Sequence, residues 1–249
     1  MIGLAVNEDD SVGTAGAPIL MQGDVLSAFA FCPTARGSRK QDDSAYNRQK
    51  TACFAKGYLD RVTLESINAK NWRWRRMVVQ FASDDVRVSF GDSEGGVTDG
   101  RLARNDSSNG YVRTMYNFSG NATATDALFR EIFQGTRGVD WSDIFNAPLN
   151  RRRVRILMDR IKNIQGGNGQ PFWNGSRDYI PVNKTIIYNE KEEGNSKDHQ
   201  SEFDSNYTWF SQPQGGGGDV YVIDLFACAG GESTDAMNFL SHGTYYWHE

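Results

Sequence analysis

The sequence predicts an all-β fold, a two-sheet sandwich with one short helix and long loops. Short segments rich in β-branched and aromatic residues recur along the chain, as they do in strands. Turn residues separate these segments, among them 26 glycines, and the 3.6-residue period of a helix is clear only once. A chain of 249 residues fits a single sandwich domain with a sizeable core.

The first strand is expected at residues 58–67, where apolar and polar side chains alternate. This period of two is typical of a strand with one buried and one solvated face. The apolar face carries Tyr58, Val62 and Leu64, and the polar face carries Arg61, Thr63 and Glu65. Further strands are predicted at 74–81, 86–90, 111–116, 153–159, 184–188, 220–225 and 244–247.

Long polar segments connect these strands, at 91–110, 166–181, 189–207 and 211–218. Such loops are longer than a simple meander of hairpins needs, whereas a jelly roll accommodates them. About eight strands with these connections therefore predict an eight-stranded jelly-roll sandwich.

One helix is predicted after residue 122. Thr123 or Thr125 can cap its start, and Gly135 marks its end. We expect this helix to dock onto the edge of a sheet. Its apolar stripe consists of Leu128, Phe129, Ile132 and Phe133.

The chain is mildly acidic, with 27 basic against 31 acidic residues, a net charge of −4 and a pI near 5.5. This balance argues against a protein that binds nucleic acid through its overall charge, so any such role needs a local basic patch. The first basic residue is Arg36, so we expect neither a basic N-terminal arm nor the charged start of a signal peptide. No apolar run is long enough to span a bilayer.

The three cysteines are Cys32, Cys53 and Cys228. An odd number without Cys-x-x-Cys spacing predicts neither a disulfide framework nor a zinc site. This usage favours a reducing, intracellular setting.

No catalytic or cofactor site is predicted. Asp198, His199 and Ser201 lie too close together in one polar loop to form a catalytic triad by themselves. His242 and His248 have no neighbouring cysteine that would complete a metal site. We therefore expect a protein that is not an enzyme and that needs neither a cofactor nor a metal.

Arginine and tryptophan alternate at residues 72–76. Arg73, Arg75 and Arg76 are candidates to grip phosphates while Trp72 and Trp74 stack on bases, as in single-strand binders. The alternative is that the two tryptophans, which share one face of a strand, anchor the core while Arg73 and Arg75 project outward.

The densest positive charge lies at residues 151–155. On a strand, alternate arginines of this run share one face, and such a stripe suits a polyanion. The alternative is that they pair with carboxylates such as Asp140 or Asp143, or with a neighbouring subunit. The candidate side chains are Arg151, Arg152, Arg153 and Arg155.

Several short motifs follow one another in a fixed order. Gly57-Tyr58 opens the first strand, and Trp-Arg-Trp-Arg-Arg follows at 72–76. Further motifs occupy 133–143, 153–160, 167–168, 181–194 and the terminal Tyr-Trp-His-Glu at 246–249. This collinear set, which covers roughly residues 50–249, resembles the capsid proteins of genomoviruses. These are small circular single-stranded DNA viruses associated with fungi and related in coat architecture to geminiviruses.

The resemblance implies an N-terminal extension at 1–55 and a jelly-roll capsid domain at 56–249. It implies many copies of the chain in a T=1 icosahedral shell around circular single-stranded DNA, located in the virion and assembled in the host cell, in its nucleus. Such coat proteins generally carry a basic N-terminal arm, from which this chain departs. Further candidates for contact with DNA before the first strand are Arg36, Arg39, Lys40, Arg48 and Lys50.

The competing hypothesis is a carbohydrate-binding β-sandwich module. Six tryptophans, ten tyrosines and polar Asn-rich loops offer rings that can stack on sugar faces. A jelly-roll hydrolase or metal oxygenase fits less well, because no His-x-Asp/Glu pair with a distant His lies on the candidate strands.

Overall fold

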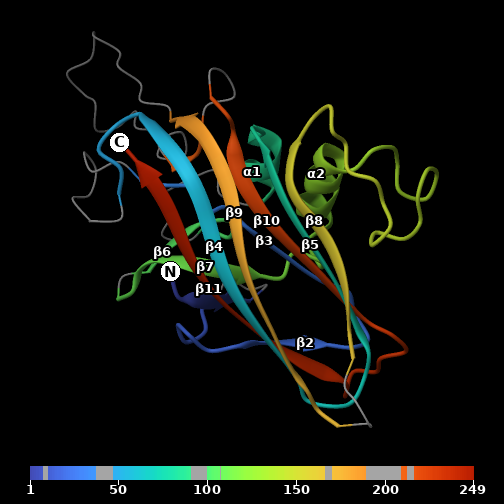
Figure 1. Ribbon diagram of the computed structural model, residues 1–249. Helices are drawn as coiled ribbons and strands as arrows, with labels where there is room; N and C mark the ends of the chain where they lie inside the picture. The colour runs from blue at the N-terminus through green and yellow to red at the C-terminus, as the bar shows by residue number, and fades with distance from the viewer. Residues whose placement is uncertain are drawn as a thin grey trace.

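A computed structural model describes residues 1–7, 11–37, 47–90, 100–106, 108–165, 170–188, 209–211 and 216–249. Within these ranges strands predominate and two helices occur, which confirms the all-β prediction (Figure 1). The helices are α1 (Asp84–Ser89) and α2 (Ala122–Ile132). The strands are β1 (Gly3–Val6), β2 (Ile19–Gln22), β3 (Ser27–Phe31), β4 (Ala52–Ser66), β5 (Trp72–Phe81), β6 (Arg104–Asp106), β7 (Gly110–Tyr116), β8 (Arg155–Ile164), β9 (Trp173–Ile187), β10 (Asp219–Cys228) and β11 (Ala236–His248).

Eight of these strands form two four-stranded sheets, named here after one central strand of each. The β4 sheet has the order β2-β11-β4-β9, and the β5 sheet has the order β3-β10-β5-β8. Among these eight strands, pairing runs from the outside of the sequence inward. Strand β2 pairs with β11, β3 with β10, β4 with β9 and β5 with β8. Pairing of β11 with β4 and of β10 with β5 rolls up this long hairpin. The topology is therefore the jelly roll that the sequence predicted.

The segment between β5 and β8 adds elements beside the sandwich. It holds both helices, and its β7 forms a third sheet of order β1-β7-β6. Asn121 caps α2, because its Oδ1 accepts the N–H of Ala124 at 3.0 Å; the predicted caps Thr123 and Thr125 lie within the helix. The predicted apolar stripe of this helix is buried, and Gly135 follows it with a φ of 78°.

The strand predicted at 86–90 is wrong, because this segment forms α1. Ser83 Oγ accepts the N–H of Val86 at 3.3 Å, and Asp84 and Asp85 lie in the first turn. A serine cap followed by acidic residues stabilises a helix N-terminus, and here it outweighs the β propensity of Val86 and Val88.

Several strands were not predicted from the sequence, some because they are fully buried and some because their residues are unusually polar. Segment 1–55, expected as an extension, supplies β1, β2, β3 and the start of β4. Strand β3 is buried throughout and pairs with β10, so it shows no alternation. Strand β9 begins inside the predicted loop 166–181, and β6 lies inside the predicted loop 91–110. The predicted loop 189–207 lies outside the described residues.

The core consists of two apolar clusters, a large one and a smaller one, separated by charged side chains. On β5, Arg76 lies between Trp74 of the smaller cluster and Val78 of the larger one. Asp60 of β4 and Asp224 of β10 hold the same position on their strands. A layer of charge therefore crosses the sandwich between its two halves.

Candidate nucleic-acid interface and buried charge layer

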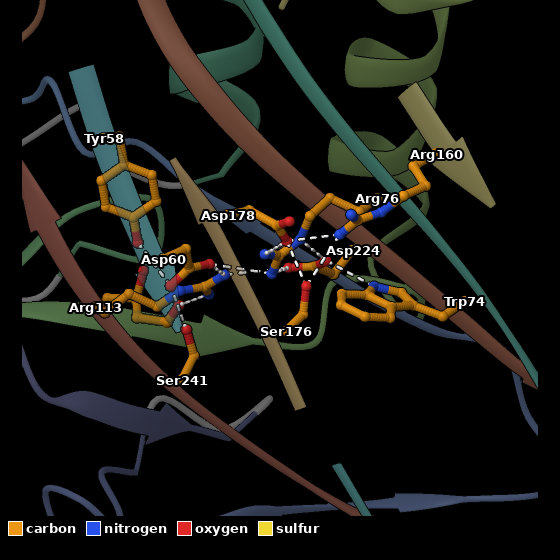
Figure 2. A network of polar contacts seen from close by, with 11 residues as sticks. Tyr58, Asp60, Trp74, Arg76, Arg113, Arg160, Ser176, Asp178, Asp224 and Ser241 are labelled. Atoms are coloured by element: carbon orange, nitrogen blue, oxygen red, sulfur yellow. Dashed lines mark hydrogen bonds and ion pairs between the residues drawn. The ribbon is translucent and has the colours of Figure 1, made fainter. Parts of the chain in front are cut away.

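The charged layer is built from residues that lie in register on neighbouring strands. In the β5 sheet, Arg76 is paired with Asp224 on one side and with Arg160 on the other. In the β4 sheet, Asp60 is paired with Asp178. Two carboxylates of one sheet thus face two guanidinium groups of the other, and Figure 2 shows these side chains converging between the strands.

Short contacts join the layer into one network. Arg76 donates two bonds to Asp224, from Nε to Oδ1 at 2.8 Å and from Nη2 to Oδ2 at 2.9 Å, and its Nη2 lies 3.0 Å from Asp60 Oδ2. Arg113 of β7 reaches in and donates to Asp224 Oδ2 at 3.1 Å, while Arg160 donates to Asp178 Oδ2 at 2.6 Å. Ser176, Ser241, Tyr58 and Trp74 supply further donors (Figure 2).

Three arginines meet three aspartates here, so the layer is neutral overall. Burial raises the pKa of the Asp224 carboxyl, but Arg76, Arg113 and the Trp74 N–H outweigh it, so this pKa lies below its usual value. Burial alone would lower the pKa of Arg76, yet Asp224 and Asp60 raise it above its usual value. Arg76 and Asp224 therefore stay charged at neutral pH, and the ion pairs of the layer cross-link the two sheets.

Four of the twelve predicted nucleic-acid contacts lie inside the molecule, namely Arg36, Arg48, Arg75 and Arg76. Arg36 lies over the ring of Tyr111, with 3.7 Å from Cζ to the ring centroid, and Arg48 lies over the ring of Tyr188 at 4.3 Å. Arg75 donates two 2.9 Å bonds to Asp159 and a third to the Ile144 carbonyl oxygen. These guanidinium groups hold the fold together and present no free surface to phosphate.

The core interpretation of Trp72 and Trp74 is confirmed. Both rings are buried, and Trp74 Nε1 donates to Asp224 at 2.8 Å. Neither ring is exposed for stacking on a base. Arg73 points outward as that interpretation expected, but it pairs with Asp143 at 3.2 Å, and Arg75 is buried.

The arginine run at 151–155 does not form the predicted stripe, because residues 151–153 lie in a turn and β8 begins only at Arg155. Arg153 contacts Glu131 at 3.4 Å, and Arg155 donates to Gln80 Oε1 and to the Val182 carbonyl oxygen. Pairing with a carboxylate is thus confirmed for Arg153, but the partner is Glu131 and neither of the two aspartates named as examples, since Asp143 binds Arg73 and Asp140 accepts from the Thr136 N–H. Within this run, Arg151 and Arg152 are exposed, and their side chains make no hydrogen bond or ion pair in the described part of the chain.

Of the remaining predicted nucleic-acid contacts, one lies in the described structure and two lie outside it. Lys50 is exposed. Arg39 and Lys40, like the Asp198, His199 and Ser201 group, lie outside the described residues. Among the residues that are described, no group of three His, Cys, Asp or Glu side chains is placed to hold a metal ion. No helix in the same ranges is long and apolar enough to cross a membrane.

Two arginines and a histidine that sequence reasoning missed lie side by side on the outer face of the β4 sheet. The register pairs Arg61 of β4 with Arg177 of β9 on one side and with His242 of β11 on the other. All three side chains are exposed, and within the described part of the chain neither arginine has an ion pair. We call the two arginines, Arg61 and Arg177, the cationic row. The period-two pattern had placed Arg61 on a solvated face, but Arg177 fell in a segment expected to be a loop.

An open pocket with a volume of 520 Å³ lies farther along the same face. The rings of Tyr179 and Tyr246 meet edge to face there, with 6.3 Å between their centroids. Tyr179 follows Arg177 by two residues on β9 and so points to the same side. The pocket is lined by Lys56, Tyr179, Tyr245, Tyr246, Trp247 and His248.

In comparisons with known proteins, no family model and no curated protein matches this chain.

Proposed function

We propose that this protein is a viral coat protein of the genomovirus kind, a subunit that assembles with many copies of itself into a small icosahedral shell around circular single-stranded DNA. The jelly-roll topology supports the proposal, because this fold is widely used by viral capsid domains. The collinear motifs between residues 50 and 249 support it independently. On this proposal the protein acts in the virion as a structural component without catalysis, after assembly in the host cell nucleus.

The observation that carries the proposal is a set of exposed apolar side chains at one end of the sandwich. We call this end the turn end, and it is formed by the β2–β3, β4–β5 and β10–β11 turns and the residues just before β9 (Figure 1). Its apolar side chains are Leu20, Val25, Ile67 and Trp173, exposed by 55%, 48%, 50% and 72%. Glu65 and Asn238 lie between Leu20 and Trp173 across the sheet, and such a mixture of apolar and polar side chains is ordinary in protein–protein interfaces.

Hydrogen bonds between the turns hold this surface in shape. The Gly23 N–H donates to the Asp235 carbonyl oxygen at 2.7 Å, and Asn68 Nδ2 donates to Asp235 Oδ1 at 2.7 Å. The N–H of Ser66 donates to the Phe172 carbonyl oxygen at 2.9 Å. A surface fixed before association loses little conformational entropy on binding, which favours assembly.

A projecting segment, residues 134–150, follows α2 (Figure 1). Val139 there is 82% exposed. The base of the segment is closed by bonds from the Gln134 N–H to the Pro148 carbonyl oxygen and from the Asn150 N–H to the Ile132 carbonyl oxygen, both 2.8 Å. The turn end and this segment are different surfaces of one chain, and contact between two different surfaces is the head-to-tail kind that can close into rings and shells.

Sedimentation velocity of the purified chain tests this assignment through Ile67→Ser. Loss of an interface anchor costs ~2 kcal/mol, so the protein concentration at which half the chain is assembled is expected to rise about 30-fold. The control is Val88→Ser on α1, where the exposed fraction is similar, 52%, but the site lies away from the turn end. If both variants assemble at the same protein concentration, the turn end is not part of the interface between subunits.

The aromatic pocket favours the carbohydrate-binding alternative, because the exposed rings of Tyr179 and Tyr246 could stack on a sugar. The positive charge of the neighbouring cationic row favours an anionic ligand, however, and not a neutral glycan. Specific binding of a neutral glycan by the unassembled chain on a glycan array would turn the assignment toward this alternative.

A further inference from the structure

We propose that the outer face of the β4 sheet binds single-stranded nucleic acid, with the cationic row contacting phosphates and Tyr179 and Tyr246 stacking on bases. This inference rests on the proposed function in one respect: it is the coat-protein assignment that identifies the bound nucleic acid as the packaged DNA. The binding itself can be measured on the chain whether or not it assembles.

The cationic row is unfavourable in the isolated chain. Arg61 and Arg177 lie directly opposite each other on neighbouring antiparallel strands, where Cβ atoms are about 5 Å apart. Like charges in this position destabilise a sheet, and no carboxylate in the described structure pairs with either of them. A phosphate between the two guanidinium groups would turn the repulsion into attraction.

The surrounding face has the same sign of charge. Lys56 also points outward, beside the aromatic pocket. Among the described outward-facing residues of β4, β9 and β11, Glu65 is the acidic one, and it accepts a bond from Asn238 Nδ2 at 3.2 Å. Glu65 lies four residues from Arg61 on β4, about 13 Å along the strand, too far for an ion pair. In a chain with a net charge of −4, this face is a local exception.

Aromatic rings beside cations are the combination that binds single strands without reading their sequence. Tyr179 is 48% exposed, and its ring follows Arg177 on the same face of β9. Tyr246 is 42% exposed, and its ring contacts the ring of Tyr179 edge to face. The long strands β4, β9 and β11 make this platform rigid, so little ordering is needed on binding.

The turn at residues 151–153 is the competing basic surface. Arg151 and Arg152 are exposed there, but Arg153 is already paired with Glu131, and in the described structure no aromatic ring contacts these arginines. The turn offers positive charge but no aromatic ring on which a base can stack, so the sheet face is the better candidate for binding single strands. It also supplies the matched control, because two arginines can be neutralised at either place.

The experiment titrates fluorescein-labelled oligothymidylate with the full-length chain at several salt concentrations. Each phosphate contact of a single strand contributes about 0.7 to the slope of log K against log salt, so the double variant Arg61→Gln, Arg177→Gln should lower that slope by about 1.4. The variant Arg61→Lys, Arg177→Lys should retain the slope. Arg151→Gln with Arg152→Gln should leave it unchanged.

Tyr179→Leu separates stacking from charge. Its affinity for oligothymidylate should fall at least about fivefold while the salt slope stays that of the natural sequence. An unchanged slope in the Arg61, Arg177 glutamine variant, or a loss confined to the Arg151, Arg152 variant, would overturn the proposal. Circular dichroism checks that each variant is folded.

Electron microscopy of the same preparations keeps the two proposals apart. If the natural chain forms closed particles but the Arg61, Arg177 glutamine variant binds oligothymidylate normally, the inference fails and the shell stands. If no particles form while the glutamine variant loses binding, the inference stands and the shell fails.

Discussion

Arg76 and Asp224 face each other in register on β5 and β10, joined by two hydrogen bonds of 2.8 and 2.9 Å, with both side chains buried. The pair anchors the charged layer that connects the β5 sheet to the β4 sheet through Asp60. Buried ions of this kind are strongly destabilising when one partner is removed, because the other charge is left uncompensated.

Replacement of Arg76 by Met should therefore lower the free energy of unfolding by ~3–5 kcal/mol. Arg73→Met is the matched control on the same strand; its ion pair with Asp143 is partly exposed, so its loss should cost under ~1 kcal/mol. Urea unfolding of dilute protein, followed by tryptophan fluorescence, measures both. Similar midpoints for the two variants would contradict the assigned role of the layer.

Acid should destabilise the fold only at low pH. The pKa of Asp178 lies below its usual value because the Ser176 hydroxyl and Arg160 outweigh the upward effect of burial, and the pKa of Asp224 is lowered by Arg76. A depressed folded-state pKa stabilises the fold above the unfolded value of about 3.9, and this contribution disappears as the pH falls through the folded value. The opposite holds for Asp219, whose pKa is raised by burial, so its contribution weakens as the pH rises above about 4.

Urea midpoints measured between pH 3 and pH 7 should therefore drop mainly below about pH 4. Asp178→Asn should flatten part of that drop, because one of the titrating groups is gone. A major transition centred near pH 6 would show that other groups control acid stability.

Gly57→Ala should disturb the bulge where β4 pairs with β9. A Cβ at this position would lie 2.6 Å from Tyr179 Oη and 2.8 Å from the Ile180 carbonyl oxygen, and the backbone oxygen cannot move aside. The expected loss of unfolding free energy is ~1–3 kcal/mol. Gly175→Ala on β9 is the control, since the atom nearest to its Cβ would be the Val62 carbonyl oxygen at 3.8 Å. A loss as large as that of Gly57→Ala would refute the steric explanation.

The cysteines should differ in reactivity. Burial raises the pKa of both Cys32 and Cys228, but Cys32 is fully buried and Cys228 only partly. Because the thiolate is the reactive form and needs access, a chromogenic disulfide reagent should label Cys228 first and Cys32 only on unfolding. Loss of the early phase in Cys228→Ser checks the assignment, and equally fast labelling of Cys32 would argue against its burial.

The sequence predicted the fold class and most of the long strands, because β4 alternates and the buried strands β5 and β10 are rich in β-branched and aromatic residues. It missed β3, which is short and contains no β-branched residue, and most of β9, where Gly, Ser, Arg and Asp resemble a loop. The helix α1 was misread because capping by Ser83 decides its structure over the propensity of its valines.

The candidate site was less predictable than the fold. Alternation along β5 puts Arg76 on the same face as Trp74. Its partner Asp224, however, lies 148 residues away, and such a pairing follows only from sheet register. The same holds for the cationic row, where Arg61 meets Arg177 only once β4 and β9 are paired. Arginines that looked free for DNA, such as Arg36 and Arg75, proved to be packed inside.

Electron microscopy of the purified, unmodified chain across a range of protein concentration, salt and pH tests the central proposal most directly. We expect uniform closed particles of one small diameter, assembled from the single chain. A chain that stays monomeric at high concentration under all these conditions would contradict the assignment as a shell subunit.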